Sequence, residues 1–255
     1  MVGRGASGTP MRALSYGARA ELYDRVRPGY PPQALSLLLA DLPADQRTKR
    51  VADVGAGTGK LTAVLAAGGL DVDAVEPDPR MRVVLAARVP GVRVHAGRGE
   101  DLPLPDGSVD AVVYCQAWHW VDDVAGAREA ARVLRPGGIL AMLWSYEDEA
   151  TAWVRELAGL IDFSPRNLPS PPVLRQFSPA KVQQLPWLRE QDVAALPDYA
   201  LSASGVASLP EQQRAEVLAA VRRLATEHPA LRGRSRVEVP MQLMYWSYRR
   251  TSPTG

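Results

Sequence analysis

Residues 51–60, with the sequence VADVGAGTGK, constrain the fold of this chain more than any other segment. A short apolar strand runs directly into three glycines, Gly55, Gly57 and Gly59, and a helix-forming run follows at once. Glycine permits a tight turn and lets the backbone approach a ligand without an intervening Cβ. The N–H groups of the first helical turn then face that ligand. This order of strand, glycine-rich turn and helix predicts a nucleotide-binding site.

The glycine spacing restricts the kind of nucleotide. G-x-G-x-G is not the dinucleotide fingerprint G-x-G-x-x-G, because Lys60 occupies the place of its third glycine. It is not a phosphate-binding P-loop either, since that loop has Ser or Thr after its lysine and this chain has Leu61. A ligand with a ribose and no phosphate fits better. Asp53, inside the strand, is expected to accept hydrogen bonds from the glycine loop or the ligand, because an unpartnered buried carboxylate is costly.

A second strand ends in an acid. The segment 71–76, with the sequence DVDAVE, is apolar in alternate positions and terminates at Glu76. An acid at the end of the strand after a glycine loop can accept hydrogen bonds from both ribose hydroxyls. We predict this role for Glu76, with a solvated strand-end carboxylate as the alternative.

Together these motifs resemble those of the class I S-adenosylmethionine-dependent methyltransferases, in order and register across residues 14–146. Four segments carry the resemblance: DVGAGTG at 53–59 (motif I), VEPD at 75–78 (the acidic motif that follows), 97–110 (the adenine-side loop) and LRPGG at 134–138 (the turn before strand five). Residues 14–32 and the triplet Trp118-His119-Trp120 are similar to a small-molecule-type branch with a methyltransferase type 11-like domain.

Strands and helices alternate along the middle of the chain, which predicts a parallel sheet with right-handed crossovers. The expected strands are 50–54, 71–76, 92–96, 109–116 and 139–145, and the expected helices are 59–68, 79–88 and 121–134. The resemblance implies an α/β, Rossmann-like, doubly wound and mostly parallel seven-stranded sheet with an antiparallel edge strand. Residues 182–188 and 236–249 would supply the strands at that edge.

We expect a disordered tail at 1–13 and a single methyltransferase domain at 14–255. Its predicted parts are an N-terminal helical cap (14–46), a donor-binding core (47–150), an acceptor-side or lid region (151–235) and a last strand (236–250). The cap contains helices at 18–26 and 33–42, and the lid region is a helical insertion near the C-terminus. A further short helix is expected near 191–196. Ser208-Leu-Pro-Glu211 is typical of a capping box that opens a helix to about residue 228.

The amino-acid composition restricts the classes of partner that the protein can be expected to bind. Apolar residues make up 46% of the chain, enough for a sizeable core, and the net charge is only +2, so a nucleic-acid partner is not expected. The lone Cys115 rules out an internal disulfide and fits a reducing compartment. Residues 1–10 lack a signal-peptide core, and no apolar run is long enough to cross a membrane. We therefore expect a cytoplasmic protein with no membrane partner.

The resemblance implies S-adenosyl-L-methionine as cofactor and S-adenosyl-L-homocysteine as product. It implies that Arg27 pairs with the donor's carboxylate and that Gln116, or the backbone of Ala117, holds its methionine part. Met81 either covers the adenine or packs in the core, and Arg98 stands where many relatives carry an acid, so backbone N–H groups at 99–100 are expected to contact the adenine. The full predicted cofactor-binding set is Tyr16, Tyr23, Arg27, Asp53, Gly55, Ala56, Gly57, Thr58, Gly59, Glu76, Pro77, Met81, Gly99, Glu100, Gln116 and Ala117.

Methyl transfer from a sulfonium is an in-line displacement in which the protein supplies positioning and exclusion of water. Such a site needs no metal, and none is predicted. The predicted catalytic residues are His119 and Tyr23. His119 has a suitable pKa for a general base if the acceptor is a hydroxyl or an acidic carbon, and a contact to donor or acceptor is its alternative role. Tyr23 would line the acceptor side.

The leading hypothesis is a methyltransferase for a small-molecule acceptor at oxygen, nitrogen or carbon. Aromatic residues around 114–120 favour an apolar or aromatic acceptor, although core packing explains them equally well. The chain lacks the Asn/Asp-Pro-Pro-Tyr/Phe signature and the cysteine pair of nucleic-acid methyltransferases. Binding of donor or product without methyl transfer, in a regulatory, structural or cyclase-like role, stays open because fold does not fix function. The sequence does not indicate an oligomeric state.

Overall fold

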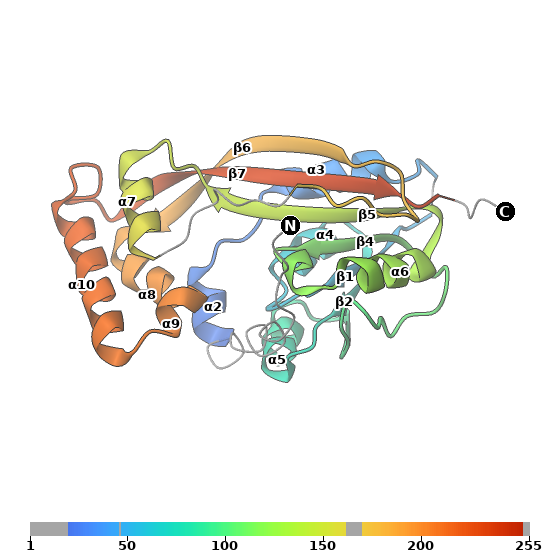
Figure 1. Ribbon diagram of the computed structural model, residues 1–255, viewed down its shortest axis with the longest axis horizontal. Coiled ribbons are helices and arrows are strands. Elements are labelled where there is room, and N and C mark those ends of the chain that lie inside the picture. The colour runs from blue at the N-terminus through green and yellow to red at the C-terminus, as the bar shows by residue number, and fades with distance from the viewer. Residues whose placement is uncertain (1–19, 46, 162–169, 252–255) are drawn as a thin grey trace.

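A single sheet of seven strands organises the molecule (Figure 1). The computed structural model describes residues 20–45, 47–161 and 170–251, so the predicted tail at 1–13 and Tyr16 lie outside the described residues. The strands are β1 (Arg50–Val54), β2 (Asp71–Val75), β3 (Arg93–His95), β4 (Val109–Cys115), β5 (Leu134–Glu147), β6 (Lys181–Asp192) and β7 (Arg236–Arg249). They lie in the order β3-β2-β1-β4-β5-β7-β6.

Five strands are parallel, and the last part of the sheet reverses. β1 pairs in parallel with β2 and β4, β2 with β3, and β4 with β5. β7 runs antiparallel to both β5 and β6, so the reversed strand lies one place in from the edge. The predicted fold class, a doubly wound and mostly parallel α/β sheet with antiparallel pairing at one edge, is confirmed. The strand order changes direction between β1 and β4, where ligands of such sheets bind.

Helices cover both faces of the sheet because the parallel strands are apolar on both sides. α3 (Pro32–Asp41) and α4 (Lys60–Ala67) pack on one face, with Leu38 and Leu65 buried against Val113. α6 (Asp123–Val133) packs on the other face through Ala130 and Val133. α5 (Pro79–Arg88) lies beside β3 and α2 (Ala20–Val26).

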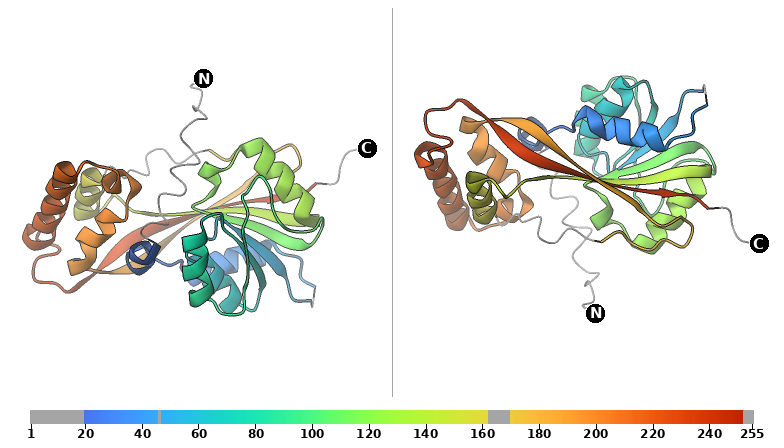
Figure 2. Two further views of the ribbon diagram at one scale, coloured as in Figure 1. Left: turned by 90° about the horizontal axis from the view of Figure 1, so that it is seen from below. Right: turned by 90° about the horizontal axis from the view of Figure 1, so that it is seen from above.

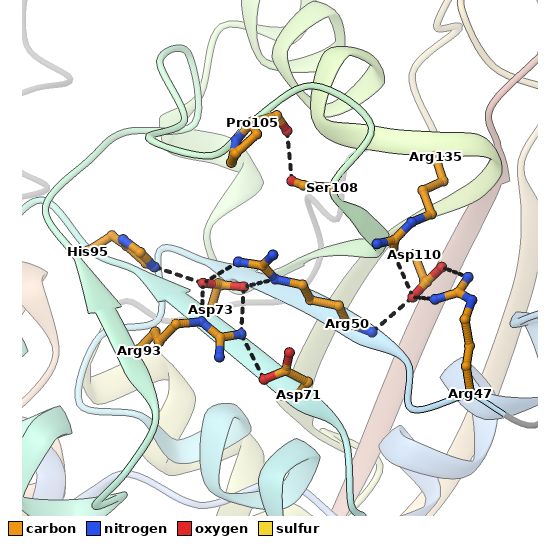
Figure 3. A network of polar contacts seen from close by, with 10 residues as sticks. All are labelled: Arg47, Arg50, Asp71, Asp73, Arg93, His95, Pro105, Ser108, Asp110 and Arg135. Carbon is orange, nitrogen blue, oxygen red and sulfur yellow. Dashed lines mark hydrogen bonds and ion pairs between the residues drawn. The ribbon is translucent and has the colours of Figure 1, made fainter.

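The link between β3 and β4, residues 96–108, contains no helix. A polar network covers the neighbouring part of the sheet instead (Figure 3). Asp73, which is fully buried on β2, accepts hydrogen bonds from Arg50 Nε at 2.7 Å and Arg93 Nε at 2.8 Å, and it contacts His95. These hydrogen bonds hold the pKa of Asp73 well below its usual range although burial acts in the opposite direction.

A second group of helices forms a helical unit at one end of the long strands (Figure 2). It consists of α7 (Ala152–Leu160), η4 (Val193–Ala195), α8 (Leu196–Leu201), α9 (Ser204–Ala207) and α10 (Glu211–Glu227). These helices share an apolar cluster that includes Leu196, Val221 and Met241 and lies apart from the two clusters on the sheet faces. Helix α2 contacts both α8 and α5, so it lies between the helical unit and the core (Figure 1).

The structure departs from the sequence expectations in this unit and in the strand before it, where β6 occupies 191–192 and the helix expected near 191–196 is replaced by η4 and α8. The predicted capping box is wrong, because α10 begins at Glu211 with Pro210 in the N-cap position and no side-chain cap. Ser208 Oγ instead donates to the Gly205 carbonyl at 3.0 Å. β6 runs on to Asp192, past the expected end at 188. In the described part of the chain, no helix combines the length and the apolar character that crossing a bilayer requires.

Candidate functional site

A cavity of about 830 Å³ lies at the carboxyl ends of β1, β2, β4 and β5. Its wall includes Val54, Glu76, Gln116 and Ser145 from those strand ends, and Tyr199 from the helical unit. It therefore occupies the switch point of the sheet, and helix α2 with the helical unit closes its far side.

The glycine loop is left-handed at each of its glycines, which favours this residue type. The φ angles are 70° at Gly55, 57° at Gly57 and 81° at Gly59. A Cβ at Gly55 would lie 2.6 Å from Ala117 Cβ, and one at Gly59 would lie 2.9 Å from Leu85 Cγ. Nothing lies within 4 Å of the corresponding point at Gly57. Gly55 and Gly59 thus permit close packing, whereas Gly57 leaves open space for a ligand.

Glu76 lies across this loop, directly after β2. Its Oε2 accepts a hydrogen bond from the Gly57 N–H at 2.9 Å, and its Oε1 accepts one from the Asp78 N–H at 2.9 Å. Burial raises the pKa of Glu76, and the two hydrogen bonds act against that rise. Pro77 and the buried Met81 line the cavity next to it. The site thus presents a buried carboxylate beside an open glycine backbone.

Asp53 is bonded by a side chain rather than by the glycine loop, and a contact to a ligand stays a prediction. Asp53 Oδ2 accepts a hydrogen bond from Thr62 Oγ1 at 2.6 Å, rather than from the glycine loop. Thr62 lies on α4 and is itself fully buried. Burial raises the pKa of Asp53 to about 6; the Thr62 hydrogen bond lowers it, and the charge of Glu76 raises it further.

The loop after β4 begins with a strained residue. Gln116 has φ 55°, the single non-glycine positive φ in the described residues, and its Nε2 donates to the Ser145 carbonyl at 2.5 Å. Such conformations concentrate at functional sites. The next residues form a short 3₁₀ turn, η2 (Trp118–Trp120), in which the His119 and Trp120 rings lie 4.7 Å apart between centroids. Trp118 packs edge-on against Tyr114 in the core with ring centroids 4.8 Å apart, so only His119 and Trp120 of the triplet line the cavity.

Gly99 and Glu100 line the cavity on the side of β2 and β4. Gly99 is buried next to Tyr114 and Val121, and a Cβ there would lie 2.8 Å from Val121 Cγ2. Glu100 Oε1 accepts a hydrogen bond from the Asp122 N–H at 3.0 Å, which fixes this loop against the start of α6.

Helix α2 is held from two sides. Lys60, directly after the glycine loop, donates from Nζ to the Asp24 carbonyl at 2.6 Å and forms an ion pair with the Asp24 carboxylate at 3.6 Å. Arg88 on α5 also pairs with Asp24. On the opposite side, Arg27 Nε donates to Ser202 Oγ at 2.8 Å. Lys60 therefore fastens the N-terminal helix to the glycine loop.

Most of the predicted site residues come together around this one cavity. Those that line it are Tyr23, Arg27, Asp53, Gly55, Ala56, Gly57, Thr58, Glu76, Pro77, Met81, Gly99, Glu100, Gln116, Ala117 and His119. Gly59 stands behind the wall, and Tyr16 is outside the described residues. Across the described residues, no group of three or more His, Cys, Asp or Glu side chains is arranged to hold a metal ion. Which of these residues bind a ligand stays a prediction.

Sequence reasoning missed other residues in the wall. They are chiefly Ser145, Glu147, Tyr199 and Met241. For Glu147 a signal existed, because it ends an apolar strand just as Glu76 follows one. Tyr199 and Met241 had no such signal, since only the tertiary packing of the helical unit brings them to the cavity.

Strand order, glycine loop and strand-end carboxylate define a Rossmann-like protein with its ligand site at the switch point. A family model described as a methyltransferase domain matches residues 52–142. An uncharacterised methyltransferase of Mycobacterium tuberculosis is 44% identical over 89% of this chain and 92% of its own length. A methyltransferase-like protein of Schizosaccharomyces pombe is 27% identical over 88% of this chain and 91% of its own length.

The structural comparison agrees. A candidate type II methyltransferase of Anaeromyxobacter dehalogenans has a solved structure that is 26% identical in sequence, covers 88% of this chain and 97% of its own, and gives a TM-score of 0.66. The chain belongs to the methyltransferase-domain family.

Proposed function

We propose that the protein is an S-adenosylmethionine-dependent methyltransferase that acts on a small-molecule acceptor. The observation that carries this proposal is the pair formed by Gly57 and Glu76. An open glycine backbone lies next to a buried carboxylate, which can accept hydrogen bonds from ribose hydroxyls where no phosphate site is built. Membership of the methyltransferase-domain family supports the same proposal.

The residues around this pair fit the rest of such a donor. When bound, the donor supplies an activated methyl group on a sulfonium. Met81 and the segment Gly99–Glu100 would hold the adenine, and Gln116 with Ala117 would hold the methionine end. Tyr23 on α2 and Arg27 directly after it would cover the bound donor and exclude water, which favours a displacement reaction.

The cavity also has room for an acceptor. Small-molecule sites occupy roughly 300–1,000 Å³, and this cavity continues past β4 to the helical unit. His119, which is exposed at the wall, would act as general base for a hydroxyl or an acidic carbon. Tyr23 would line the acceptor side of the same space.

The first test is direct titration with S-adenosylhomocysteine, with NAD as the control ligand, followed by a methyl-transfer assay with labelled donor. We expect Glu76→Ala to weaken binding of S-adenosylhomocysteine at least about tenfold, the value of one hydrogen bond to a charged group. Glu190→Ala, at an exposed position on β6, is the matched control. An unchanged dissociation constant in a folded Glu76→Ala variant would remove the ribose assignment. Donor binding without transfer to any acceptor would favour a donor-binding protein instead.

A further inference from the structure

Glu147 forms part of the cavity wall beyond the end of β4. β4 ends at Cys115, which pairs with Leu143, so Ser145 and Glu147 extend past it on β5. These two residues are two apart on a strand and therefore share a face, and both line the cavity. Glu147 is 8% exposed, an unusual degree of burial for a carboxylate that the donor half does not require.

One oxygen of this carboxylate is held firmly. The Tyr199 hydroxyl donates to Glu147 Oε1, and Arg189 Nη2 lies 3.5 Å from the same atom. Tyr199 is itself packed against the guanidinium of Arg189, 5.1 Å from the ring centroid, and against that of Arg27 at 4.9 Å. The carboxylate therefore has a fixed position before any ligand arrives, which reduces the cost of binding.

No hydrogen bond from the described residues reaches the other oxygen, Glu147 Oε2. Unlike Ser145 Oγ, this oxygen is not a solvent-inaccessible atom, and its residue lines the cavity. Ser145 Oγ, on the same face, likewise has no hydrogen-bond partner among the described residues. Buried polar atoms are nearly always hydrogen-bonded, so the unpaired Ser145 Oγ indicates a missing partner in the cavity. Glu147 Oε2, on the same face, is an acceptor that a ligand in the cavity can reach. If Glu147 served only to pair with Arg189 and join β5 to β6, its second oxygen would have no need to face the cavity.

Apolar side chains form part of the wall near these polar atoms. Ile161, Ala203 and Met241 line the cavity together with Tyr199 and the cationic Arg27. A ligand that fills this end must present an apolar body to these side chains and a hydrogen-bond donor to Glu147. A carboxylate or phosphate group facing Oε2 would be repelled by the like charge.

We infer that Glu147 anchors the acceptor, and that the acceptor is an apolar small molecule carrying a hydroxyl or amino group that donates a hydrogen bond to Oε2. This inference rests on the proposed function. Glu147 is assigned to recognition and selects the acceptor, while Tyr199 and Arg189 position its carboxylate.

The test uses the full chain saturated with S-adenosylhomocysteine and three probes with similar bodies: 4-propylphenol, 4-propylbenzylamine and 4-propylanisole. By calorimetry we expect the phenol or the amine to bind at least about tenfold more tightly than the anisole, which has no donor. Glu147→Ala should abolish that preference. Glu147→Gln should preserve part of it for the phenol and lose it for the amine, which needs the charge. Glu190→Gln is the control with the same chemical change at an exposed site.

The possible results distinguish a failure of the acceptor inference from a failure of the proposed function. If the three probes bind alike, or if none binds while S-adenosylhomocysteine does, the acceptor inference is wrong and the proposed function stands. If Glu147→Gln lowers the melting temperature or the affinity for S-adenosylhomocysteine but leaves the probe ratio unchanged, Glu147 is merely structural. If S-adenosylhomocysteine itself fails to bind the wild-type protein, the proposed function falls as well.

Discussion

Two buried carboxylates at the glycine loop, Asp53 and Glu76, show how far single residues can be predicted. The position of Glu76 follows from the sequence, because an acid directly after a parallel strand must emerge at the ligand edge of the sheet. Its two N–H partners are also local, since Gly57 and Asp78 lie in adjoining turns. The partner of Asp53 was not predictable, because Thr62 reaches it only through the packing of α4 on β1.

Asp53 should make stability depend on pH. Its folded-state pKa of about 6 lies above the unfolded value of about 4, so the folded protein binds this proton more tightly. The stability of the wild-type protein should therefore fall as pH rises from about 4 to 6 and level off above. Relative to wild type, Asp53→Asn should become more stable between pH 4 and pH 8, by up to about 3 kcal/mol.

Urea unfolding of both proteins at the two pH values measures this change. At each pH, the free energy of unfolding of the wild type is subtracted from that of Asp53→Asn. The change of this difference with pH does not contain the pH-independent cost of placing an amide at a site built for a carboxylate. A difference that is the same at pH 4 and pH 8 would show that folding does not change the pKa of Asp53.

At the scale of elements, the helices and strands between residues 47 and 150 were predictable. Each has a regular spacing of apolar residues or ends at a glycine. Helix α2 was predictable as a helix, at 18–26 against the observed Ala20–Val26. Its attachments were not, because Asp24 contacts Lys60 and Arg88, and Arg27 contacts Ser202, far away in sequence. The triplet at 118–120 shows the same limit, since the 3₁₀ turn directs Trp118 into the core.

Asp24→Ala should loosen α2 over the cavity. The change removes both ion pairs that join α2 to the core, which together are worth about 1 kcal/mol at this degree of exposure. We expect about a fivefold weaker affinity for S-adenosylhomocysteine, seen by calorimetry, and faster hydrogen exchange in α2. Glu21→Ala, an exposed acid on the same helix, is the control. Equal effects of the two substitutions would show that general charge, rather than the attachment, matters.

At the scale of the whole molecule, the mostly parallel seven-stranded sheet with its antiparallel edge followed from the resemblance, whereas the packing of the helical unit did not. Residues 151–235 carry no motif, and their packing depends on an apolar cluster assembled from three separate parts of the chain. The cavity is closed by this cluster on one side and by the sheet on the other. The part of the cavity wall that the helical unit supplies could therefore not be derived from sequence, although the part formed by the glycine loop and the strand ends could.

The apolar cluster of the helical unit is separate from the two clusters on the sheet faces, so we expect the helical unit to unfold locally more easily or less easily than the sheet. Leu196 is 1% exposed in the helical unit, and Leu196→Ala should cost about 2–5 kcal/mol locally. Hydrogen exchange followed by mass spectrometry should accelerate in α7, α8 and α10 and stay unchanged in β1 and α4. Uniform acceleration across the chain would instead indicate one cooperative unit.

The arrangement of β5, β6 and β7 bears on how acceptor preference changes during divergence. The helical unit enters the chain at one end of the sheet, after β5 and between the end of β6 and the start of β7, while every glycine-loop residue comes from earlier in the chain. Segments 148–161 and 193–235 lie outside the parts of the chain that carry Glu76 and Glu147. Under the proposed function, replacing them with the corresponding segments of a relative should change which apolar body the acceptor site takes. The hydrogen-bond preference set by Glu147 and the affinity for S-adenosylhomocysteine should stay unchanged.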